Sequence, residues 1–403
     1  MRTKAFQGLV PHPDHVNGVA TVPYDVVNTE EARAMAAGRP YDLLHVDRAE
    51  IDLPPDTDPY CDLVYETALT KFKELQEEGI LLREEQPCIY VYEQIMGEHR
   101  QIGITLSCHI DDYGDNVIRK HEKTRPVKED DRTRLVDTLS AHTGPIFLTY
   151  KDRAGIDAKV AEIVKGTPVY DLKDERGVQH RVWRLTDCDA LLGEFADVPL
   201  SYVADGHHRS ASAWRVGSER RAKNPSHTGN ESYNWFLGVL FPASQLKVLG
   251  YHRVVKDLGN LTKEQFIDCL RQVAKVEASG RQDPSAPGQT CLYLDGQWYT
   301  LTWPENESKS PIDKLDVSVL QKLVLDPILG IRDVRTDSRI DFVGGIRGAG
   351  ELEKRVDSGE WAVAFSMYPV TVDQLMEIAD ADEIMPPKST WFEPKLRSGL
   401  FIY

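Results

Sequence analysis

The sequence predicts a mixed α/β fold with more than one domain. The chain has 403 residues, and at about 150 residues per domain this length suits two or three domains. Hydrophobic residues make up 41% and charged residues 28% of it, which is typical of a folded globular protein. Short β-rich apolar runs alternate with stretches of helical spacing along the whole chain. This alternation favours α/β architecture over a sandwich or a helix bundle.

The first long helix is expected at residues 61–78. Its apolar residues recur every three or four positions, which places them on one face of a helix. They are Val64, Ala68, Phe72 and Leu75. Gly79 follows, and glycine readily takes the left-handed conformation that ends many helices.

A β-hairpin is expected next, at residues 88–96 and 100–110, with Gly97 in the short connection. The elements that follow, up to residue 255, are assigned in the same way, from apolar runs and helical spacing. Strands are expected at 145–150, 199–204, 235–241 and 247–255, and helices at 127–140, 153–164 and 207–216.

A second α/β unit is expected after residue 256. Thr262 and Thr371 each precede a helical pattern and are good N-cap residues. Strands are expected at 291–295 and 298–303. We therefore expect two domains, residues 1–255 and 256–403. The end of the chain has the prolines, aromatic residues and cations of a segment held against a surface.

The net charge narrows the classes of partner. Sixty-four acidic against 48 basic side chains give −16 at pH 7, which opposes attraction to nucleic acid or to an anionic membrane. The chain shows neither an apolar run of the roughly 18 to 20 residues that span a bilayer nor a signal peptide. Six scattered cysteines lack metal-ligand spacing and suit a reducing compartment. We expect a cytoplasmic protein without nucleic-acid or membrane partners, and a homo-oligomer is compatible with the sequence.

The strongest chemical signal is the run Asp205–Arg209, which follows a β-rich stretch and opens a helical one. A strand that turns into a helix here leaves backbone N–H groups at the positive end of the helix dipole, beside two imidazoles and a guanidinium. This corner suits a phosphate. In a purely structural alternative, Asp205 caps the helix and Gly206 supplies an unusual backbone angle. Zinc binding by His207 and His208 lacks the usual partner ligands.

A second polar cluster spans residues 120–134. Its mixed charges suit the solvated start of a helix. His121 and Glu122 fit this less well, because they lie in a loop after a β-like stretch, where catalytic carboxylates are often found. A glutamate near a bound hydroxyl can act as general base. Three arginines are candidates for holding a carboxylate or a phosphate: Arg125, Arg132 and Arg134.

Together these motifs resemble the domain of unknown function 1015 family of bacterial and archaeal proteins. The resemblance runs over almost the whole chain, through residues 22–27, 119–134, 143–150, 204–213 and 385–395. The family looks like a relative of the ParB/sulfiredoxin fold, which binds nucleotides at a polar strand-to-helix turn and includes free-serine kinases. The resemblance implies a ParB/sulfiredoxin-like nucleotide-binding core with a second, C-terminal α/β unit, and it implies ADP or ATP as donor with Mg²⁺.

The free-serine kinases carry the same Asp-Gly-His-His-Arg run, and a catalytic Glu preceded by His to which His121-Glu122 is similar. By this resemblance Glu122 is the general base, and Asp205 and His207 join it in catalysis, with Asp205 also holding Mg²⁺ or the acceptor. The phosphate-binding residues are then Gly206, His207, His208 and Arg209, and the acceptor-binding residues Thr124, Arg125 and Arg132.

The sequence differs from the free-serine kinases in the spacing between the expected general base and the Asp205–Arg209 run. Glu122 and Asp205 lie 83 positions apart, farther than in the serine kinases, so an insertion must separate the two motifs. Glu93 or Glu129 is the alternative base if the true counterpart lies elsewhere.

The sequence thus predicts a small-molecule kinase that transfers a phosphoryl group from ADP or ATP to a hydroxyl, with free L-serine as the expected acceptor. The familiar nucleotide signatures, a Walker A loop and a GxGxxG turn, are absent. Two alternatives stay open: a non-catalytic nucleotide-binding regulator of the ParB-like class, and a metal-dependent phosphohydrolase. The charge of −16 argues against the DNA role of ParB-type relatives.

Overall fold

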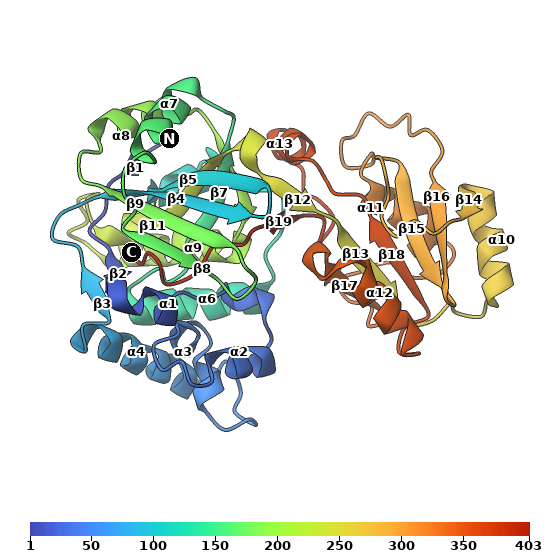
Figure 1. The fold of residues 1–403 in the computed structure, drawn as a ribbon, viewed down its shortest axis with the longest axis horizontal. Coiled ribbons are helices and arrows are strands. Elements are labelled where there is room, and N and C mark those ends of the chain that lie inside the picture. The colour runs from blue at the N-terminus through green and yellow to red at the C-terminus, as the bar shows by residue number, and fades with distance from the viewer. The chain divides into compact units, whose positions relative to one another are not determined.

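The computed structural model describes residues 1–403, which form two compact units. Unit 1 comprises residues 1–120, 124–246 and 394–403, and unit 2 comprises residues 121–123 and 247–393 (Figure 1). Apart from residues 121–123, unit 2 begins at residue 247, whereas the sequence suggested 256. The chain returns to unit 1 at residue 394, so unit 2 is inserted into the sequence of unit 1.

Unit 1 is built around a nine-stranded mixed sheet with the order β6-β10-β7-β11-β5-β4-β9-β8, and β1 pairs with β5. The pairs β6–β10 and β7–β11 are parallel, and the others are antiparallel. The strands are β1 (Thr3–Lys4), β4 (Ile89–Met96), β5 (His99–His109), β6 (Ile118–Arg119), β7 (Ile146–Tyr150), β8 (Tyr170–Lys173), β9 (Gln179–Leu185), β10 (Ser201–Asp205) and β11 (Trp235–Pro242). A separate ladder joins β2 (Leu9–Pro11) to β3 (Leu81–Arg83).

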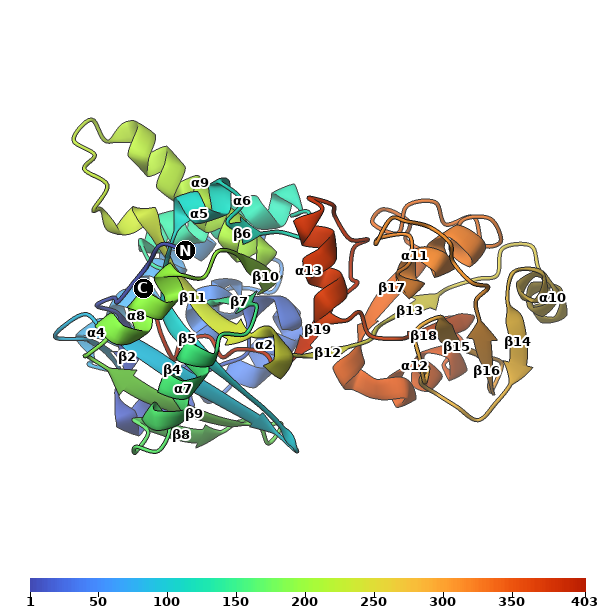
Figure 2. The same ribbon diagram turned by 90° about the horizontal axis from the view of Figure 1, so that it is seen from above.

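The helices of unit 1 contribute to three hydrophobic clusters, the smallest of which contains α2. One face of the sheet packs against α7, α8 and α9, and α4 forms a second cluster with α6 (Figures 1 and 2). The helices are α1 (Val16–Val19), α2 (Thr29–Ala36), α3 (Leu44–Asp47), α4 (Asp62–Glu77), α5 (Ile110–Gly114), α6 (Pro126–Leu139), α7 (Ala154–Ile163), α8 (Asp189–Ala196) and α9 (His207–Lys223).

The C-terminal segment, residues 394–403, is part of the interior of unit 1. The ring of Phe401 lies 4.8 Å from Tyr90 and 5.6 Å from Tyr92, centroid to centroid, on the sheet face opposite the cluster with α7 and α8. Ile402 exchanges backbone hydrogen bonds with Leu9, at 2.9 Å each way. The segment is therefore held along its length, as its composition suggested.

Unit 2 contains a six-stranded antiparallel sheet with the order β14-β16-β15-β18-β13-β17. Helix α12 packs on it and completes a separate core, as Figure 2 shows. A two-stranded ladder pairs β12 with β19. The strands are β12 (Lys247–Leu249), β13 (Tyr251–Val255), β14 (Lys275–Ala278), β15 (Gln289–Leu294), β16 (Gln297–Thr302), β17 (Ile340–Gly344), β18 (Val363–Met367) and β19 (Trp391–Glu393). The helices are α10 (Lys263–Val273), α11 (Asp316–Leu320), α12 (Gly348–Asp357) and α13 (Val372–Asp380).

The mixed α/β class and the second α/β unit are confirmed. Helices α10 and α13 begin with capping boxes at Thr262 and Thr371, as expected. One expected strand is wrong: residues 247–255 form β12 and β13, interrupted at Gly250. A Cβ there would lie 2.2 Å from the carbonyl oxygen of Met367, so this close approach requires glycine. None of the helices combines the length and the apolar character needed to cross a bilayer.

Candidate functional site

The run Asp205–Arg209 forms the corner between β10 and α9. Gly206 separates the two elements with φ 95° and ψ 34°, a left-handed conformation that favours glycine. A Cβ on it would meet the Nε atom of Arg209 at 3.1 Å. As N-cap residue, Gly206 offers no side-chain acceptor to the first turn of α9. This turn therefore presents the positive end of a 17-residue helix without a cap from its N-cap side chain.

The Asp205 carboxylate is held between two cations. Its Oδ1 lies 3.0 Å from Nζ of Lys395, and its Oδ2 lies 3.0 Å from Nη2 of Arg209. Arg209 also donates from Nη1 to the carbonyl of Pro145, at 2.5 Å. Burial raises the pKa of Asp205, but the charges of Lys395 and Arg209 outweigh it and hold the pKa below its usual range. Asp205 is thus ionised and does not cap the helix.

The two histidines have different environments. His207 is 7% exposed, and burial lowers its pKa to about 4, although the Asp205 carboxylate opposes this shift. Its ring is therefore neutral at pH 7, so it can contribute a hydrogen bond but no charge. His208 is half-buried, and its Nε2 accepts the backbone N–H of Arg125 at 3.0 Å. This bond ties the start of α6 to the start of α9.

Arg132 forms a buried polar cluster next to this corner. Its guanidinium lies 4.0 Å from the ring centroid of Tyr24 and 2.8 Å from the Asp131 carboxylate, and it donates to the Asp47 carbonyl at 3.1 Å. Burial lowers the pKa of Arg209, but Asp25, Asp205 and Asp47 more than offset this and raise it. Asp47, which binds Arg132 through its carbonyl, therefore also acts on the charge of Arg209 at the corner.

The segments that carry the family resemblance contribute side chains to one region of unit 1. Tyr24, Arg132, Arg209 and Lys395 come from four of them, and the loop before β7 supplies the carbonyl of Pro145. Lys395 and Asp47 were not singled out from the sequence. A lysine 190 positions from its carboxylate partner gives no local signal.

Arg132 also lines a small polar cavity of about 180 Å³. Arg48 contributes a second guanidinium, 3.1 Å from Oε1 of Glu50, and donates to Oγ1 of Thr29 at 3.0 Å. Asp47 and Asp131 are the other buried acidic residues of the lining. Charged residues of both signs therefore line the cavity, with Lys128 added to the two arginines and the three acidic residues. A cavity of this size and composition suits a small zwitterion, whose carboxylate and ammonium both need a partner.

The other predicted site residues come just before α6 in the chain: His121, Glu122, Thr124 and Arg125. His121 belongs to unit 2, where its backbone oxygen accepts the N–H of Met385 at 2.8 Å. Glu122, the residue after it, is half-buried and also belongs to unit 2. The Arg125 side chain is exposed, and Thr124 donates from Oγ1 to Oε2 of Glu129 at 2.5 Å.

The two alternative bases are both engaged. Glu93 is 1% exposed on β4 and is ion-paired with Arg100 at 2.6 Å and with Arg181 at 3.4 Å. Glu129 on α6 accepts the Thr124 hydroxyl and lies 3.8 Å from Nη1 of Arg215. Glu93 is committed to two cations on the sheet, and so it does not suit a base that must take a proton.

Asp205 does not fit as a Mg²⁺ ligand in this arrangement. Each of its two oxygens already accepts from a cationic donor at 3.0 Å, and those two charges would repel a divalent ion at the same carboxylate. The chemistry of the donor set therefore contradicts the assignment of the metal to Asp205. The residue instead orients Lys395 and Arg209.

Residues 3–318 match the family described as "Protein of unknown function (DUF1015)". The chain belongs to this family. The description of the family names no activity. The chemistry of this protein is therefore inferred from the residues of the site. No curated protein sequence matches the chain.

Several solved structures are similar to this member of the DUF1015 family. A free serine kinase in complex with AMP is 14% identical, with a TM-score of 0.39, over 72% of this chain and 86% of that one. A conserved hypothetical protein from Pyrococcus furiosus is 13% identical, with a TM-score of 0.37, over 73% and 93%. SbnI from Staphylococcus aureus, with a C-terminal truncation, is 10% identical, with a TM-score of 0.38, over 73% and 85%.

Proposed function

We propose that this protein is a phosphotransferase that moves a phosphoryl group from ADP or ATP to the hydroxyl of a small acceptor, with free L-serine as the first acceptor to test. The observation that carries the proposal is the corner at Gly206. There the start of a long helix lies beside two cations whose shared carboxylate is ionised. Helix N-termini with adjacent cations bind phosphate groups.

In this proposal the phosphates of the donor bind at the first turn of α9. The backbone N–H groups after Gly206 and the Lys395 ammonium face the developing charge, and Arg209 holds the turn in shape through Pro145. His207, neutral at pH 7, donates a hydrogen bond. Phosphoryl transfer depends mainly on positioning and on charge stabilisation, which this corner supplies.

The acceptor binds in the cavity of about 180 Å³. Arg132 and Arg48 take its carboxylate, and Glu50 and Asp131 take its ammonium. This assigns part of the role expected for Arg125 to Arg48, a residue that sequence reasoning missed. A volume of this size admits a small amino acid and excludes a large one.

Glu122 remains the proposed general base. It precedes Arg125 by three residues, so the peptide chain keeps the two Cα atoms within about 11 Å, and the Arg125 N–H binds His208 at the corner. Glu122 takes the hydroxyl proton as the acceptor oxygen bonds to phosphorus and the bond to the leaving phosphate oxygen breaks. AMP leaves if ADP is the donor, and ADP leaves if ATP is the donor. Mg²⁺, bound through the phosphates, would neutralise part of their charge.

The direct test is to incubate the purified protein with serine, Mg²⁺ and either ADP or ATP, and to detect O-phosphoserine by mass spectrometry. Product formation supports the kinase. Nucleotide binding without product favours a non-catalytic regulator, and metal-dependent phosphate release without an acceptor favours a phosphohydrolase. Either of the last two results overturns the kinase proposal.

Two variants separate the proposed roles. Glu122→Gln should lower turnover at least about 100-fold, the usual contribution of a general base, with nucleotide affinity nearly unchanged. Glu98→Gln, at the exposed turn between β4 and β5, is the matched control and should leave turnover unchanged. Arg209→Ala should weaken nucleotide binding itself. If Glu122→Gln lost nucleotide affinity as strongly as Arg209→Ala, the division of roles would be wrong.

A further inference from the structure

A larger cavity in unit 1 takes no part in the proposed reaction. It has a volume of about 770 Å³ and lies among the N-terminal segment, α4, α6 and α9. None of the residues of the corner, 205–209, lines it. Its size falls within the range of about 300 to 1,000 Å³ that small-molecule sites occupy.

Part of the wall of this cavity is apolar and aromatic. Phe6 comes from the N-terminal segment, Phe72 from α4 and Val216 from α9, and Tyr233 and Tyr403 add two further rings. Phe72 and Val216 are 5% exposed and Phe6 is 2% exposed, so these side chains are held firmly by their surroundings. Walls of this kind favour a ligand with an apolar or aromatic body.

The charges around the cavity have one sign. The chain has 64 acidic residues in 403, so the 24 lining residues should include 24 × 64/403, about four, acidic side chains. The lining has no Asp or Glu side chain, whereas Lys4, Lys73, Arg83 and Arg220 are basic. A protein with a net charge of −16 therefore surrounds this cavity with cations, which attract anions.

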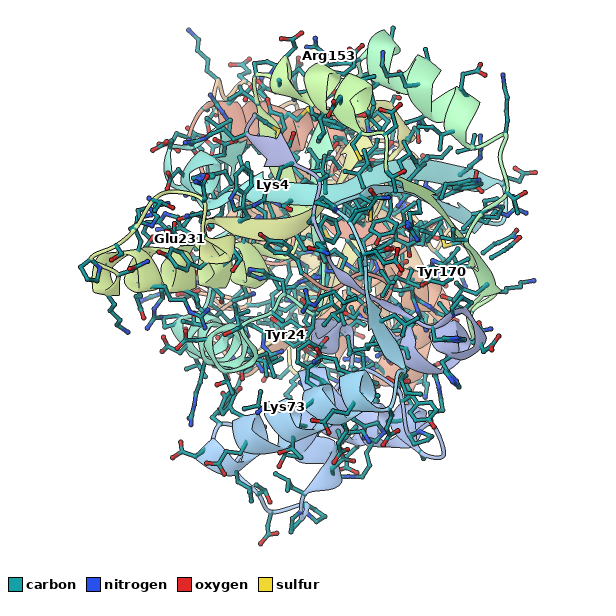
Figure 3. All side chains as sticks on the ribbon, turned by 90° about the vertical axis from the view of Figure 1, so that its left-hand side faces the viewer. Lys4, Tyr24, Lys73, Arg153, Tyr170 and Glu231 are labelled. Carbon is teal, nitrogen blue, oxygen red and sulfur yellow. The ribbon has the colours of Figure 1, made fainter.

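The two lysines differ from the two arginines in their partners. Arg220 is ion-paired with Asp137 at 2.8 Å, and Arg83 donates to the carbonyl of Gln7 at 3.2 Å. Lys4 and Lys73 have no carboxylate partner in the structure; Figure 3 shows them on the same side of the molecule, Lys4 above and Lys73 below.

Lys4 is the more informative of the two lysines. Its ammonium lies 4.3 Å from the ring centroid of Trp235, a contact that supplies no negative charge. Burial lowers the pKa of Lys4, and no opposing charge offsets that effect. An anion bound beside Lys4 would supply the missing opposite charge.

We propose that this cavity binds a small amphipathic organic anion. The apolar or aromatic body of the ligand lies against Phe6, Phe72 and Val216, and its anionic head group, a carboxylate, a sulfonate or a phosphate, pairs with Lys4. Lys73, which is exposed on α4, adds a weaker attraction at the rim. This site is independent of the proposed phosphoryl transfer.

Two fluorescent probes of similar shape and different charge test the proposal: 8-anilinonaphthalene-1-sulfonate, which is an anion, and N-phenyl-1-naphthylamine, which is neutral. The anion should bind the full-length protein with a stoichiometry of one. Lys4→Gln should weaken it at least fivefold while leaving the neutral probe unchanged, and Lys73→Gln should have a smaller effect. The control Lys71→Gln, on the same helix but outside the lining, should change neither.

A cavity-filling variant locates the bound probe. Val216→Trp should abolish binding of both probes, whereas Ala222→Trp, at an exposed position of the same helix, should not. Circular dichroism and the melting temperature identify a variant that fails to fold, and the lysine variants keep the test valid in that case. Binding of the anion that Lys4→Gln leaves unchanged overturns the proposal. So does binding that a folded Val216→Trp leaves unchanged, or a stoichiometry well above one.

Discussion

The two units differ in the partners that they give to buried cationic side chains. In unit 1, Asp205 lies 3.0 Å from both Arg209 and Lys395, and Arg132 is paired with Asp131 and with the Asp47 carbonyl. These pairs are made between side chains as far as 190 positions apart. Unit 1 thus surrounds its buried cations with carboxylates.

Unit 2 buries Arg253 among backbone oxygens instead. The guanidinium donates to the carbonyl of Tyr251 and, at 3.2 Å, to that of Lys388, and burial lowers its pKa to about 10. Carbonyl oxygens satisfy a single cation without adding a second charge. The comparison teaches that unit 1 holds a buried network of opposite charges, which is the kind of environment in which phosphate chemistry is found. The ion pairs of unit 2, such as that of Arg355 with Asp341 and Glu351, are more exposed.

The largest effect should come from breaking the network at Lys395. The change Lys395→Met leaves a half-buried Asp205 with one cation, and removing one partner of such a pair costs about 3 kcal/mol. Hydrogen exchange of β10, measured against β13, should show this loss in unit 1 alone. The control Lys165→Met, at a 68% exposed ion pair, should cost about 0.5 kcal/mol or less. Equal costs for the two variants would show that the buried pair does not stabilise the corner.

One buried histidine in each unit, His207 in unit 1 and His252 in unit 2, should contribute to the pH dependence of stability. Burial lowers the pKa of each to about 4. The folded pKa lies below the unfolded value of about 6.5, so their stabilisation is present above pH 6.5 and is lost as the pH falls toward 4. At pH 4 the free energy of unfolding has fallen by on the order of 3 kcal/mol for each histidine.

The two histidines can be tested against each other. His207→Gln should reduce the pH dependence of hydrogen exchange in unit 1 between pH 6.5 and 4.5 and leave that of unit 2 in place. His142 should maintain the rest, because burial also lowers its pKa to about 4. His252→Gln should do the reverse. A pH profile that neither substitution changes would mean that carboxylate protonation governs acid unfolding instead.

A smaller difference is expected between two tyrosine–carboxylate pairs. Tyr65 donates to Asp131 at 2.8 Å, and that carboxylate is 7% exposed, whereas Tyr293 donates at 2.9 Å to the exposed Asp357. Tyr65→Phe leaves a buried charged acceptor short of a partner and should cost about 2 kcal/mol. Tyr293→Phe should cost about 0.5 kcal/mol, since water replaces the lost donor. Urea titration of the two variants gives both values, and a reversed order would contradict the role of burial.

The smallest effect should come from the helix caps of unit 2. Thr262 accepts the backbone N–H of Gln265 at 3.3 Å, and Thr371 accepts that of Gln374 at 3.1 Å. Thr262→Ala and Thr371→Ala should each cost about 1 kcal/mol, and replacement by serine should restore most of it. Neither should change nucleotide binding. A loss of nucleotide affinity in either variant would show that α10 or α13 contributes to nucleotide binding.

Local patterns predicted the elements whose conformation depends on their own residues. The helix at 61–78 was recognised from its apolar spacing, and α4 buries those side chains and ends before Gly79, with φ 71°. The β4–β5 hairpin turns at Gly97 for the same local reason. The strand at 247–255 was predicted wrongly because its interruption depends on Gly250 meeting the Met367 carbonyl, which is more than a hundred residues away.

The candidate site divides in the same way. The corner residues Asp205–Arg209 were recognised because a strand, a glycine and a helix start are all readable within nine positions of sequence. Their partner Lys395 could not be recognised, because a long-range ion pair leaves no trace in residue spacing. Arg48 and Glu50 were missed for the same reason, because only the folded chain places them around the same cavity as Arg132.

The order of residues alone therefore determined the α/β class, the approximate bounds of the elements recognised from it, and the glycine-based turn that starts α9. These features depend on backbone preference and on contacts between near neighbours. Only the folded chain decided which charges meet, which histidine stays neutral and where the two cavities lie. Electrostatic energy and desolvation depend on distances through space, and those distances exist only once segments that are far apart in the sequence have packed together.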